Sequence, residues 1–178
     1  MNWRRTCVIA AAVCLLATRG AIAHDLHPAA NVVEISPRLV TAGQPDAAAL
    51  GRLKAQGFEA VIYLAPASVP DAVRDEQLIV TRQGITFVNI PVRFDNPTEA
   101  DFETFAAVLS ALGNRKVLVH CQVNLRASSM VFLYRAIKLK EEPRQAYEAV
   151  TRVWAPDGPW RRLIEQQLRK HHVSFELL

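Results

Sequence analysis

The residues best suited to chemistry in this chain lie in the segment 117–129, which contains a cysteine and an arginine in the order Cys-x4-Arg. Cys121 follows a short apolar run, and Arg126 stands near the start of a helical pattern. The N–H groups of a first helical turn bind anions, and the positive end of the helix dipole favours a thiolate over a thiol. Such a thiolate can attack phosphorus or sulfur while the guanidinium holds a tetrahedral oxyanion through two parallel hydrogen bonds. The spacing therefore indicates nucleophilic catalysis by Cys121.

The loop after Cys121 offers the atoms that an anion would contact, because a helix leaves its first N–H groups without partners in the helix. Asn124 is the non-glycine type that best tolerates a left-handed conformation in so tight a loop. Ser128 and Ser129 could stabilise a departing thiolate by hydrogen bonding. The residues expected to bind the anion are Gln122, Val123, Asn124, Leu125, Arg126 and Ala127.

The elements that must position this loop alternate between strands and helices. Strands are expected at 32–35, 38–41, 60–64, 85–92 and 116–120. Helices are expected at 46–57, 70–83, 98–112, 126–139, 143–154 and 159–172. This alternation predicts an α/β fold with a central, mainly parallel sheet flanked by helices on both faces. Active sites of such sheets lie at the carboxyl ends of the strands, which is where Cys121 falls.

Residues 1–23 have the three parts of a cleavable signal peptide: a basic start, an apolar run and an Ala-x-Ala exit. We expect cleavage between Ala23 and His24 and a periplasmic or secreted protein in which residues 24–178 form a single domain. An uncleaved membrane anchor is the alternative. Removal of the segment leaves Cys121 as the one thiol and lowers the net charge from +4 to +1. That charge predicts neither nucleic-acid binding nor stable membrane association.

The order His-Cys-x4-Arg between a strand and a helix resembles the signature of the cysteine-dependent tyrosine and dual-specificity phosphatases. The chain is more closely similar to a bacterial branch of that superfamily, the phosphatase-like domains of the DUF442 type. That branch carries a Gly-Gln-Pro turn, matched by Gly43-Gln44-Pro45, and an Asp-Asn-Pro stretch, matched by Asp95-Asn96-Pro97. The similarity spans roughly residues 31–165.

This resemblance implies a three-layer phosphatase-like fold and hydrolysis of phosphomonoesters through a phosphocysteine, without metal or cofactor. The substrate would be a phosphorylated protein or a phosphorylated small molecule. Asp95 matches the family's general acid, which protonates the leaving oxygen and then activates water. His120, the residue before the nucleophile, would support the loop and help to keep the thiol ionised.

The loop departs from the usual phosphatase pattern, because four residues instead of five separate Cys121 from Arg126 and none of the four is glycine. Rhodanese-type sulfurtransferases also use Cys-x4-Arg loops, so sulfur transfer is the first alternative. A non-catalytic, anion-binding pseudophosphatase is the second.

The sequence Trp154-Ala155-Pro156-Asp157 is similar to the Trp-Pro-Asp acid loop of tyrosine phosphatases, but it follows the cysteine loop in the chain. We therefore expect a turn there, with Asp157 capping the last helix.

Overall fold

The computed structural model describes residues 25–177. The expected signal peptide and its cleavage site lie outside these residues. In chain order the elements are β1 (Val33–Ser36), β2 (Leu39–Ala42), α1 (Ala47–Leu50), β3 (Ala60–Tyr63), α2 (Glu76–Thr81), β4 (Thr86–Asn89), α3 (Glu99–Ala111), β5 (Val117–His120), α4 (Leu125–Leu133), a π-helical segment η1 (Tyr134–Lys138), α5 (Pro143–Thr151) and α6 (Gly158–Lys170).

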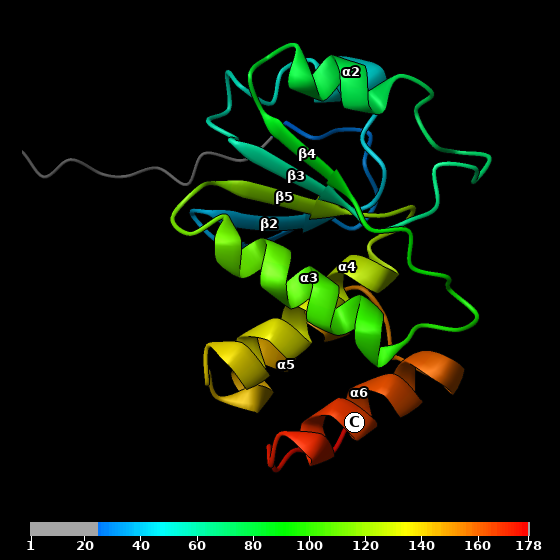
Figure 1. The fold of residues 1–178 in the computed structure, drawn as a ribbon, viewed down its shortest axis with the longest axis vertical. Coiled ribbons are helices and arrows are strands. Elements are labelled where there is room, and N and C mark those ends of the chain that lie inside the picture. Colours follow the sequence, from blue (N-terminus) through cyan, green and yellow to red (C-terminus); the bar gives the residue numbers. More distant parts are fainter. Residues whose placement is uncertain (1–24, 178) are drawn as a thin grey trace, which may run out of the picture.

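The strands form one sheet in the order β1-β2-β5-β3-β4 (Figure 1). β1 runs antiparallel to β2, whereas the other neighbouring strands are parallel, as the alternation of elements predicts. β5 lies at the centre, where His120 is level with Ala42 of β2 and Tyr63 of β3. Cys121 therefore leaves the sheet at its middle, on the carboxyl edge.

Helices cover both faces of the sheet and give the expected three layers (Figure 1). α1 and α2 lie on one face, where Leu50 and Val80 belong to one buried cluster. α3 and α4 lie on the other face, and α5 and α6 pack against α4. Phe102 of α3 and Met130 of α4 belong to the larger buried cluster, which also contains Cys121. None of the described helices combines the length and hydropathy that crossing a bilayer requires.

Some elements are shorter than the sequence predicts. The helix expected over 70–83 is confined to Glu76–Thr81, because turns occupy the residues around Pro66 and Pro70. The strand expected over 85–92 is confined to Thr86–Asn89. Both corrections lengthen loops at the carboxyl edge of the sheet, where they can reach the cysteine loop.

Candidate active site

The cysteine loop turns sharply between β5 and α4. Cys121 is fully buried, and its backbone N–H donates to the Ala42 carbonyl over 3.3 Å. Asn124 adopts the left-handed conformation expected of it (φ 71°) and is the residue before α4. Its Nδ2 atom donates to Thr41 Oγ1 over 3.0 Å and to the Asn31 carbonyl, which fixes the turn from two sides. α4 therefore starts four residues after Cys121 and directs its N-terminus at the loop.

Gly43 and Gln44 pack directly on this loop. Gly43 forms an isolated β-bridge with Val123, and the backbone N–H of Gln44 donates to the Gln122 carbonyl over 2.9 Å. A Cβ atom on Gly43 would lie 2.8 Å from the Gln122 carbonyl oxygen and 2.9 Å from that of Ala30. The Gly-Gln-Pro motif is thus a backbone support for the cysteine loop, and its first position has no room for a side chain.

Arg126 is buried, with 5% of its surface exposed, and its guanidinium is held on several sides. Nε donates to the Val92 carbonyl over 3.0 Å, and Nη1 donates to Gln122 Oε1 over 3.3 Å. The guanidinium carbon lies 5.2 Å from the centroid of the Phe94 ring, a cation–π distance. The loop after β4 therefore orients the cation that the sequence predicts as the oxyanion binder.

Gln122 links Arg126 to a second loop. Its Nε2 atom donates to Asp71 Oδ1 over 2.7 Å, so the amide spans from the Asp71 carboxylate to the guanidinium. The Tyr63 hydroxyl lies near the same charges. Burial raises the pKa of Tyr63 above its ordinary value, and the nearby negative charges raise it further, although Arg126 opposes them. These charges belong to Glu76, Asp71 and Cys121.

His120 is fully buried beside Glu76, a residue of α2 that sequence reasoning missed. His120 Nε2 lies 2.6 Å from Glu76 Oε1, and the Tyr63 ring stacks on the imidazole with centroids 4.8 Å apart. An acidic residue in a first helical turn is a common surface feature, which explains why the sequence did not single it out. The one available signal was its spacing of four from the buried Val80.

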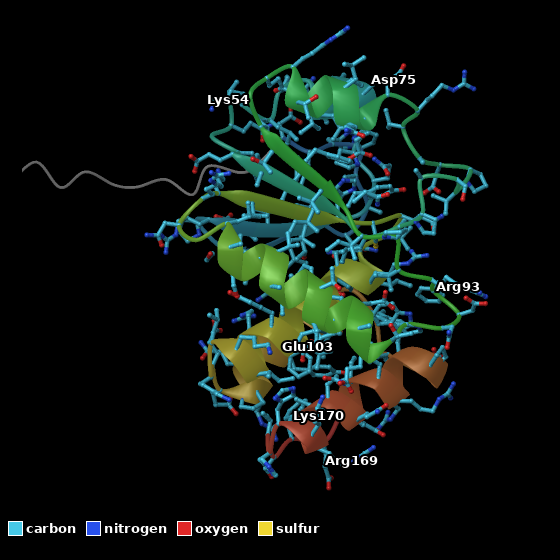
Figure 2. The ribbon with its side chains drawn as sticks, viewed as in Figure 1. Lys54, Asp75, Arg93, Glu103, Arg169 and Lys170 are labelled. Carbon is cyan, nitrogen blue, oxygen red and sulfur yellow. The ribbon has the colours of Figure 1, made fainter. Side chains whose placement is uncertain are left out.

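Asp95 lies away from this cluster and pairs with its neighbour Arg93. Arg93 Nε donates to Oδ1 over 3.1 Å and Nη2 to Oδ2 over 2.7 Å, and both side chains are mostly exposed. These hydrogen bonds from Arg93 hold the pKa of Asp95 below its ordinary value. Arg93 stands at the outer edge of the loop between β4 and α3 (Figure 2). The acid role of Asp95 stays a prediction, since its carboxylate faces Arg93 in this structure.

The other predicted residues occupy the first turns of α4. The Ser128 and Ser129 hydroxyls both donate to the Leu125 carbonyl, over 3.2 and 2.8 Å. Their predicted hydrogen bond to the thiolate would require these hydroxyls to rotate, and that role stays a prediction. Ala127 is fully buried in the same turn, next to Arg126. Among residues 25–177, no group of three or more His, Cys, Asp or Glu side chains is arranged to hold a metal ion.

Trp154 and Trp160 lie against the loop that carries Asp95, although they follow the cysteine in the chain. Their rings are each 6.0 Å from the Phe94 ring, centroid to centroid, and Trp160 Nε1 donates to the Phe94 carbonyl over 2.9 Å. Asp157 precedes α6 as expected, but its side chain makes no capping hydrogen bond. Trp154 of that stretch and Trp160 of α6 therefore anchor the loop.

Comparisons with a protein-family model and with solved structures both point to phosphatases. The family described as DSP-PTPase phosphatase fused to NAD+ kinase matches residues 27–164. The crystal structure of a DUF442 candidate phosphatase from Shewanella putrefaciens CN-32 is 32% identical, with a TM-score of 0.74 over 80% of this chain and 92% of that chain. A search of curated proteins found no match.

More distant structures share the fold. TpbA from P. aeruginosa is 19% identical, with a TM-score of 0.60 over 79% of this chain and 84% of that chain. The core catalytic domain of the PP-IP phosphatase SIW14 from S. cerevisiae is 13% identical, with a TM-score of 0.62 over 79% and 85% of the two chains.

Proposed function

The chain belongs to the DSP-PTPase family of cysteine-dependent phosphatases, and from this premise we propose that it hydrolyses phosphomonoesters through a phosphocysteine on Cys121. The single observation that carries the proposal is the arrangement of the buried thiol, at the end of β5, in one short loop with the anchored guanidinium of Arg126. A phosphoryl group carries its charge on equatorial oxygens, so catalysis needs mainly positioning and positive electrostatics.

In the first step the Cys121 thiolate attacks phosphorus. The S–P bond forms, the ester P–O bond breaks, and the leaving oxygen takes a proton. Arg126 Nε is already bonded to the Val92 carbonyl, so Nη1 and Nη2 are the atoms with which it would bind phosphate oxygens. The loop N–H groups up to Ala127 would bind the remaining oxygens.

In the second step water attacks phosphorus, the S–P bond breaks and inorganic phosphate leaves. We assign Asp95 as the group that protonates the leaving oxygen in the first step and takes a proton from water in the second. Its carboxylate would have to turn from Arg93 toward the bound ester for this role.

The Gln122 side chain would have to move when substrate binds, because its Oε1 accepts a hydrogen bond from Arg126 Nη1, the atom that a phosphate oxygen would also use. Its hydrogen bond to Asp71 gives the released amide a second partner at the rim of the loop.

The substrate class is a phosphorylated protein or a phosphorylated small molecule. Two distant relatives support this breadth, since TpbA has been crystallised with phosphotyrosine and SIW14 is a PP-IP phosphatase. The net charge of +1 on the predicted mature chain favours neither of these two substrate classes.

The decisive experiment compares wild type and Cys121→Ser on p-nitrophenyl phosphate. We expect hydrolysis by wild type, no turnover by the variant, and protection of Cys121 from iodoacetate by vanadate. If wild type leaves phosphate esters intact but transfers thiosulfate sulfur to cyanide, the four-residue loop serves sulfur transfer instead. If it does neither and still binds phosphate, the protein is an anion-binding pseudophosphatase.

We also propose that the protein is exported, on the basis of the signal-like segment 1–23. Expression of the full chain in a Gram-negative host should yield a periplasmic protein beginning at His24. An intact N-terminus in the cytosolic fraction would contradict this.

A further inference from the structure

A buried carboxylate lies beneath the cysteine loop without a part in the reaction described above. Glu76 is 4% exposed, and acidic side chains are rarely buried so completely unless they are paired. Burying an unpaired carboxylate is strongly unfavourable, so its partners define its role.

Two side chains contact this carboxylate. Gln44 Nε2 donates to Oε2 over 3.0 Å, and His120 Nε2 lies 2.6 Å from Oε1. A carboxylate accepts at both oxygens, whereas an amide accepts at only one and presents an NH2 group to the other donor. Glutamine at position 76 would keep only one accepting oxygen and would lose the negative charge.

The contact also determines how His120 is held. The Glu76 carboxylate lies against Nε2 and the Tyr63 ring stacks on the imidazole, so two side chains hold the ring in place. The charged and titratable groups that act on the stacked Tyr63 are Glu76 from α2, Asp71 from the preceding loop, and Cys121 and Arg126 from the cysteine loop.

The two partners of Glu76 stand on either side of the nucleophile. His120 immediately precedes Cys121, and the backbone N–H of Gln44 donates to the carbonyl of Gln122, the residue that follows Cys121. The carboxylate thus connects both flanks of the thiol through one residue on a different element.

We propose that Glu76 is a positioning residue for Cys121, acting through His120 and Gln44 to hold the nucleophile in its reactive geometry. This role rests on the proposed function. It also links two motifs that the sequence presents separately, the Gly-Gln-Pro turn and the His-Cys pair.

The test uses Glu76→Gln, with Asp75→Asn as a matched control because Asp75 is an exposed acid at the preceding position, on the outer surface (Figure 2). We expect Glu76→Gln to lower kcat on p-nitrophenyl phosphate about tenfold or more with KM within about twofold, since it removes the negative charge 2.6 Å from His120 Nε2. Alkylation of Cys121 by iodoacetamide at neutral pH should slow in parallel. Asp75→Asn should match wild type in both assays.

A purely structural role predicts a lower melting temperature with unchanged kcat and alkylation rate, and that result would overturn the proposal. A loss of kcat with unchanged alkylation would overturn it as well. If Glu76→Gln does not fold, Gln44→Leu tests the proposal in the same two assays. This variant keeps the Glu76 carboxylate and removes the amide that donates to it. The alkylation assay needs no substrate. If the wild type does not hydrolyse phosphate esters, the proposed function is refuted, but the alkylation rates of wild type and Glu76→Gln still test whether Glu76 positions Cys121.

Discussion

Arg126 illustrates at the scale of a single residue why a guanidinium differs from an ammonium group at this position. Its Nε atom is bonded to the Val92 carbonyl and its guanidinium carbon lies over the Phe94 ring, so one end is anchored, while Nη2, and Nη1 once Gln122 releases it, can bind an anion. A lysine has one point charge for both tasks.

We therefore expect Arg126→Lys to lower kcat on p-nitrophenyl phosphate by about 100-fold or more, the usual cost of a lost transition-state donor. Vanadate should also protect Cys121 from iodoacetate less well. Arg135→Lys is the control, because Arg135 pairs with Glu141 on a different part of the molecule. A variant with near-normal kcat would show that the guanidinium does not contact the transferring group.

The Arg93–Asp95 pair gives a pH prediction with a definite sign. Arg93 lowers the pKa of Asp95, and a general acid must be protonated to work, so activity should fall as pH rises through that pKa. Arg93→Ala lets the pKa of Asp95 rise toward its ordinary value, and the falling limb of kcat/KM on phenyl phosphate, which reports the free enzyme, should move to higher pH.

The control for this profile is Arg169→Ala, which removes an exposed arginine of α6 (Figure 2). A limb that stays in place in Arg93→Ala would mean that Asp95 is not the titrating acid.

At the scale of elements, the site depends on how closely the segment after β2 approaches the cysteine loop. Gly43→Ala would place a methyl group 2.8 Å from the Gln122 carbonyl oxygen, and backbone atoms cannot retreat as a flexible side chain can. We expect a loss of about 1–3 kcal/mol in the free energy of unfolding from overpacking, together with a clear fall in kcat.

Gly51→Ala is the matched control, because Gly51 has an ordinary helical φ and its nearest contacts for a Cβ are at 3.4 Å. Chemical denaturation and steady-state kinetics of both variants measure the difference. Equal behaviour of the two would remove the steric argument for glycine at position 43.

The start of α3 offers a stability prediction that is independent of catalysis. The Asp101 N–H donates to the Thr98 hydroxyl, and the Thr98 N–H donates to the Asp101 carboxylate, which together form a capping box. Thr98→Ala should lower the free energy of unfolding by about 1 kcal/mol in urea denaturation, with kcat unchanged. An unchanged midpoint would show that the cap is not formed in solution.

The sequence predicts most of these elements because their signals are local. An apolar run such as 60–64 or a capping pattern such as Thr98–Asp101 can be recognised from neighbouring residues alone. The Glu76–His120 contact joins residues 44 positions apart on different elements, and no local pattern reports it. The sequence predicts too long a helix over 70–83 for a related reason. The segment after Pro70 carries Asp71, which accepts a hydrogen bond from Gln122 of the cysteine loop, and no local pattern reports this contact.

At the scale of the whole molecule, the last helix reaches back to the site. Trp160 of α6 is almost fully buried and bonds the Phe94 carbonyl, while the Phe94 ring covers the Arg126 guanidinium. α6 is also tied to the start of α3, where Lys170 and Gln167 both bond Glu99. Phe94, in the loop that carries the predicted acid, thus contacts both Arg126 of α4 and Trp160 of α6.

We expect Trp160→Phe to lower kcat severalfold, because the loop loses one anchoring hydrogen bond and its contact with Arg126 loosens. Tyr147→Phe is the aromatic control, since Tyr147 packs on Phe132 and Phe175 instead. Kinetics on p-nitrophenyl phosphate distinguish the two. Equal activity in both variants would show that the helix does not govern the loop.

This anchoring has a consequence for the order in which the protein is made. A ribosome adds Cys121 and Arg126 before it reaches position 160, so an unfinished chain already contains the thiol but lacks the indole that secures the covering loop. Incomplete copies should therefore be less active, and full activity should appear only once the final helix has docked.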